Sequence, residues 1–167
     1  MKFAFLITFL LCSLATFGQN VLFLDFGQNS TRVDSFLQTR DYLELVEKMD
    51  GEILSSKIDS INEIKYYFKT DKLYAVEDKR SYASLKDAQD ALNGCLSYLE
   101  GKGEVYKAFN SKDVQHFVAV DENKMTEVII YSNARPFRAE VHLKSTSRKY
   151  GPRMKTESFI AELTMAK

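Results

Sequence analysis

The residues of this chain that could carry out acid–base or metal chemistry centre on one histidine. His116 and His142 are the only imidazoles, and Asp113 and Asp121 lie a few residues to either side of His116. A carboxylate within hydrogen-bond reach of an imidazole is the arrangement that general acid–base catalysis uses, and the same groups bind metal ions. One hypothesis is therefore a hydrolase or metal-assisted enzyme that uses His116 with Asp113 or Asp121.

The pattern around each histidine also has a purely structural interpretation. His116 is in phase with Val114, which predicts a buried, neutral side chain on the apolar face of a strand. His142 is in phase with Glu140 and Lys144, so we expect it to be a solvated surface residue. Both histidines can be accommodated without a catalytic role.

Nucleophile and metal motifs are missing from the sequence. It contains no Gly-x-Ser-x-Gly elbow, no Ser-x-x-Lys pair, and none of the His-x-His, His-Glu-x-x-His or Cys-x-x-Cys spacings that bind metals. Cys95 falls on the apolar stripe of a predicted helix, where a thiol behaves as a small hydrophobic group rather than as a nucleophile. We therefore expect no metal and no cofactor, and favour a protein without catalytic activity.

A second group of candidate residues is basic. Five cations occur between Lys144 and Lys155 with no acid among them, and Tyr150-Gly-Pro provides a turn. Such a loop would contact an anionic surface with salt-sensitive affinity, although an ordinary solvated connection has the same composition. Weak association with anionic surfaces is thus a further hypothesis.

Tyrosine supplies the remaining candidate contact. In the alternating segment 63–69, Tyr66 and Tyr67 must point to opposite faces of one strand, so one ring is predicted to be buried and the other exposed beside Lys65 and Lys69. An exposed tyrosine on a sheet favours contact with a protein or a glycan, although half-covered sheets also carry tyrosines that have no partner. The full set of predicted binding residues is Tyr67, Lys144, Arg148, Lys149, Tyr150, Arg153 and Lys155.

Two helices are predicted to position these groups. Asn29, Ser30 and Thr31 are good helix-start residues, and the spacing of the apolar residues after them predicts a short helix that ends at about Arg40. The stronger signal starts at Ser84, an N-cap, and its apolar stripe runs up to a stop at Gly101. Helices with such stripes pack against a sheet.

Much of the rest of the chain has the alternating apolar and polar residues that predict strands. Expected hairpins join Tyr42–Met49 to Glu52–Ile58 through Asp50-Gly51, and Glu63–Lys69 to Leu73–Glu77 through Thr70-Asp71. The run Leu43–Lys48 could also extend a helix. Further strands are predicted at Glu104–Phe109, Val114–Val120, Thr126–Ser132 and Phe137–Lys144, while Ser158–Met165 suits a strand or a helix. The run Val128–Tyr131 is apolar on both faces, which predicts a strand covered on both sides. We expect an α+β domain with a mainly antiparallel sheet of hairpins, about two helices packed on it, and no internal repeat.

The start of the chain has the composition of a secretory signal peptide. Lys2 precedes an apolar run from Phe3 to Phe17, and the small residues at Thr16 and Gly18 predict cleavage after Gly18. Residues 1–18 are then the leader, and 19–167 form a single exported domain, periplasmic or secreted. Cleavage would remove Cys12 and leave no second cysteine for an intramolecular disulfide. With 23 basic and 23 acidic residues, no nucleic-acid partner is expected.

The opening run, Phe26-Gly27-x-x-Ser30/Thr31-x-Val33-x-x-Phe36-Leu37 followed by hairpins, resembles the helix-plus-hairpin units of periplasmic outer-membrane-assembly lipoproteins and β-lactamase-inhibitor-like proteins. The resemblance implies a non-catalytic binding or scaffolding role in the cell envelope. The leading hypothesis is accordingly an exported binding module for an unknown protein or glycan partner. The hydrolase and the anionic-surface contact are the alternatives.

Overall fold

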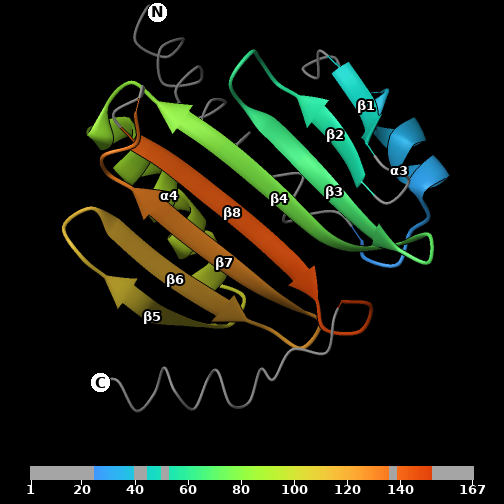
Figure 1. Cartoon of the computed structure of the whole chain (residues 1–167). Coiled ribbons are helices and arrows are strands. Elements are labelled where there is room, and N and C mark those ends of the chain that lie inside the picture. Colours follow the sequence, from blue (N-terminus) through green and yellow to red (C-terminus); the bar gives the residue numbers. More distant parts are fainter. Residues whose placement is uncertain (1–24, 40–44, 50–52, 136–138, 152–167) are drawn as a thin grey trace, which may run out of the picture.

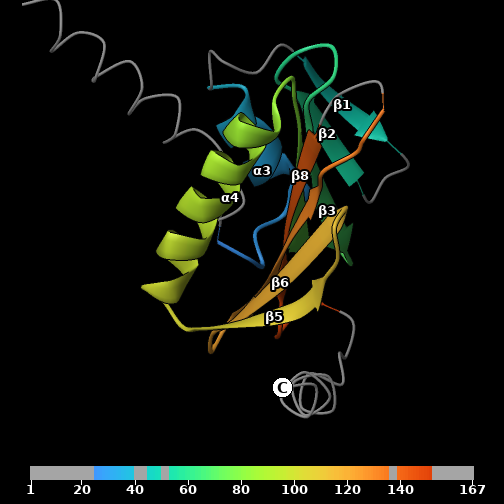
Figure 2. The same cartoon turned by 90° about the vertical axis from the view of Figure 1, so that its left-hand side faces the viewer.

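The described part of the chain forms an eight-stranded antiparallel sheet with both described helices on one of its faces (Figures 1 and 2). The computed structural model describes residues 25–39, 45–49, 53–135 and 139–151, the second of these ranges by its backbone alone. The elements are α3 (Ser30–Leu37), β1 (Leu45–Met49), β2 (Ile53–Lys57), β3 (Glu63–Lys69), β4 (Lys72–Tyr82), α4 (Leu85–Glu100), β5 (Glu104–Asn110), β6 (Val114–Val120), β7 (Lys124–Tyr131) and β8 (Ala139–Ser147). This architecture confirms the predicted α+β class.

The order of the strands reveals two similar halves. Each half is a helix followed by a four-stranded meander, and the sheet order β1-β2-β3-β4-β8-β7-β6-β5 places the last strands of the two halves side by side. The seam between the halves runs from Ala75 opposite Thr146 to Tyr82 opposite Ala139. The order of elements repeats although the sequence has no sustained repeat, because similar folding units need share only their apolar periodicity, not their residues.

The longer helix, α4, is the best-predicted element. The Ser84 side chain accepts a hydrogen bond from the backbone N–H of Asp87 at 3.1 Å, and the helix stops before Gly101, as the sequence predicts. Its buried stripe, which includes Cys95 and Leu99, packs against β4, β5, β7 and β8. Burial raises the pKa of the Cys95 thiol to about 12, with a smaller contribution from the carboxylate of Asp78, which agrees with an inert core thiol.

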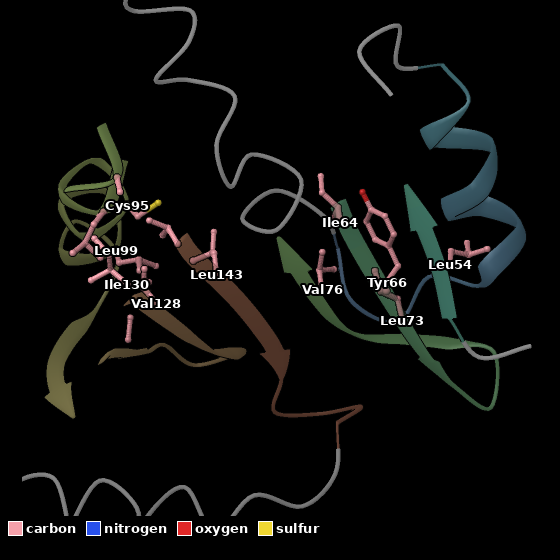
Figure 3. Close-up of a cluster of buried hydrophobic side chains, with 14 of the residues drawn as sticks. Leu54, Ile64, Tyr66, Leu73, Val76, Cys95, Leu99, Val128, Ile130 and Leu143 are labelled. Atoms are coloured by element: carbon pink, nitrogen blue, oxygen red, sulfur yellow. The ribbon is translucent and has the colours of Figure 1, made fainter. Parts of the chain in front are cut away.

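The shorter helix, α3, covers the other half of the same face. Asn29 caps it by accepting a hydrogen bond from the backbone N–H of Arg32, and Val33 and Leu37 are buried. Figure 3 shows the buried side chains of β2, β3 and β4, including Leu54 and Tyr66, apart from the group beneath α4. The helix ends at Leu37, three residues before the predicted end.

Turn residues and strand pairing account for most strand boundaries. Thr70 and Asp71 both adopt positive φ, at 51° and 54°, which is the geometry of a tight two-residue hairpin and confirms the predicted turn. β4 and β8 extend beyond their predicted ends because they pair with each other along the seam. The predicted signal peptide (1–18), the Asp50-Gly51 turn, Phe137 and the Ser158–Met165 segment lie outside the described residues. Within the described ranges, no helix has both the length and the hydropathy needed to cross a bilayer.

Candidate functional site

The structure divides the predicted site residues between two places. The first is the face of the sheet opposite the helices, called the open face below, which no described helix covers and which faces the viewer in Figure 1. The second is a groove at one corner of the molecule. Tyr67, His116, His142 and Lys144 lie on the open face, Asp121, Arg148, Lys149 and Tyr150 line the groove, and Arg153 and Lys155 lie outside the described residues.

A row of alternating charges crosses the middle of the open face. Neighbouring strands place Glu127 beside Lys144, Lys144 beside Glu77, and Glu77 beside Lys65. Opposite charges at facing positions stabilise a sheet, and they neutralise one another along this charged row. Lys144 was expected in a basic loop. It lies instead inside β8, because that strand continues to Ser147.

Tyr67 joins the charged row, as its predicted exposure on a sheet face suggests. Its hydroxyl donates a 2.6 Å hydrogen bond to Glu77, and the ammonium of Lys144 lies 5.4 Å from the centre of its ring. Burial and the hydrogen bond to Glu77 raise the pKa of the Tyr67 phenol. Its neighbour Tyr66 is fully buried on the helix side, which confirms that the two rings lie on opposite faces, although Tyr67 is half-buried rather than exposed.

The structure does not bring His116 together with either predicted aspartate. His116 is on the same side of β6 as Val114, as expected, but that side is the open face. Its Nε2 atom lies 3.4 Å from Glu127 Oε1 on the adjacent strand. Asp113 and Asp121 lie beyond opposite ends of β6, roughly 25 Å apart at about 3.3 Å per residue. Asp113 accepts a hydrogen bond from the Asn133 side chain, and Asp121 from the backbone of the turn that follows β6.

His142 is held by neighbours rather than fully solvated. Its Nε2 lies 3.1 Å from Glu140, its ring centre is 4.9 Å from that of Tyr131, and 24% of its side chain is exposed. Lys79 also contacts Glu140 at 3.2 Å. Burial raises the pKa of Glu140, but its hydrogen bonds to His142 and Lys79 outweigh that effect, and the net shift is downward. This cluster has the character of a structural ion-pair network.

The part of the open face formed by β5, β6 and β7 is apolar. Phe109 faces His116 there and is 54% exposed, while Ile129 and Tyr131 are half-buried. The registers place the following side chains on this apolar patch: Tyr106, Phe109, Val114, Val118, Val120, Met125, Ile129 and Tyr131. Val118 and Met125 are buried beneath their neighbours, Phe109 is exposed, and the others are half-buried. The expectation that Val128–Tyr131 is covered on both sides is wrong among the described elements, because α4 covers only the side of Val128 and Ile130. The apolar character on both sides was the available signal for this patch.

The groove has a volume of about 1080 Å³ and is built from four separate segments. These are Asp25-Phe26, the end of α4 with the residues after it, the turn between β6 and β7, and the end of β8 with the residues after it. Gly27 beside the groove has φ +89°, and a Cβ there would lie 2.6 Å from the Tyr150 ring. Glycine thus permits the Tyr150 ring to pack against the chain at this wall.

Cations on aromatic rings characterise the groove. The Lys102 ammonium lies 5.7 Å from the Tyr98 ring centre, and the Lys149 ammonium lies 5.2 Å from that of Tyr150. Burial lowers the pKa of Lys124; Asp121 opposes this shift, and the charge of Lys102 adds to it. Sequence reasoning found the residues after β8 but missed those after α4, which only the fold brings to the same wall.

No protein-family model, curated protein or solved structure matches the chain at a significant level. Among the described residues there is also no group of three or more His, Cys, Asp or Glu side chains that could hold a metal ion. The open face and the groove are therefore the two candidate sites among the described residues.

Proposed function

We propose that this chain is an exported, non-catalytic binding module that engages a partner protein through its open face. The observation that carries the proposal is the apolar patch on β5–β7, bordered by the charged row and covered by neither described helix. Protein interfaces have this composition, with an apolar and aromatic centre and a polar rim. A soluble domain rarely leaves such a patch on its surface unless something binds there.

Several contacts favour a protein over a glycan as the occupant. Sugar rings stack on free aromatic faces, but Tyr67 already contacts Lys144 and Tyr74, and Tyr131 already contacts His142. The centre of the patch is aliphatic, as at Ile129, which suits the side chains of another protein. The alternating signs of the charged row would orient that partner and reject mismatched surfaces rather than attract a polyanion.

The other hypotheses from the sequence have less support. The hydrolase would need His116 and a carboxylate aimed at a common point beside a nucleophile or bound water, whereas His116 faces Glu127 on an open sheet. Export is proposed from the signal-peptide pattern of residues 1–18. Amino-terminal sequencing of the protein recovered outside the cytoplasm tests it directly, with Gln19 as the expected first residue.

The test of the proposed function places a charge in the centre of the patch. The purified protein and its Ile129→Asp variant are immobilised and incubated with envelope and extracellular fractions. Ser97→Asp serves as the matched control, because Ser97 is exposed on α4 and the substitution adds the same charge. A partner that is retained by the wild type and by Ser97→Asp, but bound at least about tenfold more weakly by Ile129→Asp, supports the proposal.

A charge reversal in the row sharpens the test. Glu127→Lys places a second cation beside Lys144. If the row orients the partner, Glu127→Lys also weakens binding while circular dichroism shows that the variant is folded. Equal capture of the same partner by wild type, Ile129→Asp and Glu127→Lys would contradict the proposal.

A further inference from the structure

We infer that the corner groove is a second binding site, for an organic anion that carries an apolar body. Its volume of about 1080 Å³ is large enough for a small organic ligand. The site lies at the end of α4, and of the residues of the apolar patch it includes Val120 alone. The inference is therefore independent of the partner protein.

The floor of the groove is apolar. The lining includes buried Leu99 together with the half-buried side chains of Phe26, Val120, Tyr98 and Tyr150. Such a floor holds a hydrocarbon or aromatic body by burying its surface, at about 25 cal/mol per Å² of apolar area. Leu99 also belongs to the core of the domain, so the floor is anchored on a buried element.

Among the described residues, four basic and four acidic side chains line the groove, and three of the basic ones are not paired with an acid. Lys102, Arg148 and Lys149 form no ion pair with any described residue. Lys102 and Lys149 lie over tyrosine rings, and Arg148 donates to the backbone carbonyl of Asp121. Each cation is thus positioned by a contact that leaves its charge available to an anion.

Four acids of the described chain also line the groove, but none of them is ion-paired with Lys102, Arg148 or Lys149. The Asp121 carboxylate accepts the backbone N–H groups of Asn123 and Lys124, and Glu104 accepts the hydroxyl of Tyr106. Asp25 and Glu122 are both exposed. A bound carboxylate, sulfonate or phosphate would give the three cations the ion-pair partner that the lining does not supply.

The experiment uses 1-anilinonaphthalene-8-sulfonate as the probe, with the uncharged N-phenyl-1-naphthylamine as its analogue. We expect saturable fluorescence enhancement by the sulfonate at one site per chain and weaker binding of the uncharged analogue. Lys102→Glu and Lys149→Glu should each weaken sulfonate binding at least about tenfold. Lys112→Glu, on the exposed turn between β5 and β6, is the matched control and should leave binding unchanged.

The apolar patch on the open face is a competing site for the same probe, so Ile129→Asp is included. Sulfonate binding that survives Ile129→Asp and falls with Lys102→Glu supports the groove. Binding lost with Ile129→Asp, or equal in wild type, Lys102→Glu and Lys149→Glu, overturns it. Circular dichroism of each variant establishes that it is folded.

Displacement of the probe then distinguishes the sources of the anion. Decanoate should displace it and decanol should not, because only decanoate has the charge. Sedimentation with phosphatidylglycerol vesicles, sensitive to Lys149→Glu, would assign the anion to a membrane lipid. Displacement by decanoate without vesicle binding would assign it to a free amphiphile. If decanoate does not displace the probe and the protein does not sediment with the vesicles, the inference is overturned.

Discussion

The reactivity of Cys95 tests the packing of α4 and the strand register together. The thiol is only 5% exposed, and burial raises its pKa from 9.0 to about 12. At pH 8 the thiolate fraction falls from roughly one in ten to about one in ten thousand, since each unit is a factor of ten. Because the thiolate is the reactive form, modification by Ellman's reagent should be about a thousandfold slower than for an ordinary thiol.

The assay follows the thionitrobenzoate that Ellman's reagent releases as it reacts with the mature chain, from which Cys12 leaves with the predicted signal peptide. Within the native state the residual rate reports transient opening of the helix, so moderate urea should accelerate it steeply. The control is Ser97→Cys in a Cys95→Ser background, which places a thiol on the exposed side of the same helix. Rapid modification of native Cys95, at a rate similar to that control, would refute the helix phase.

Three further predictions concern stability and can be measured by urea denaturation followed by circular dichroism. Asp78→Asn should lower the free energy of unfolding by about 3–5 kcal/mol, because it removes one partner of the buried pair with Arg80, whose Nε lies 2.6 Å from the carboxylate. A decrease of less than about 1 kcal/mol would contradict that account. Leu99→Ala should lower the free energy of unfolding by about 2.7–5 kcal/mol, because it leaves a cavity beneath α4. An unchanged free energy would mean that the surrounding side chains close around the smaller residue. The pKa of Glu140 is lower in the folded than in the unfolded state. Its contribution to the free energy of unfolding is therefore present above the unfolded-state pKa, near 4.5, and is lost as the pH falls through the folded-state pKa. Glu140→Gln should therefore reduce the acid dependence of stability below about pH 4.5, and an unchanged acid limb would refute this role.

Local signals explain why much of the fold was predictable. The N-cap at Ser84, the hairpin at Thr70-Asp71 and the strand Val114–Val120 each depend on neighbouring residues, and each is confirmed. Alternation also tells which side chains share a face of a strand. It does not tell which face the helices will cover, and for that reason His116 was assigned to the buried side of its strand.

The two candidate sites depend on contacts that no local pattern contains. Lys144 is in the charged row because Glu77 and Glu127 are placed beside it from strands distant in sequence. Lys102 and Arg148 line one groove because α4 ends near the end of β8. The composition of 144–155 did predict a basic segment, but only the pairing of β8 along the seam separated its sheet residue from its groove residues.

The seam between β4 and β8 has a consequence for how the chain folds. Hairpins within each half join strands that follow one another closely, whereas Ala75 and Thr146 belong to opposite halves. Closing a long loop costs more chain entropy than closing a hairpin, so the meanders are favoured to form before the seam. Until it closes, β4 and β8 each present an unpaired edge that could recruit the matching strand of another molecule. Domain-swapped dimers, with the β4 of one chain on the β8 of another, are the misfolded species expected at high protein concentration.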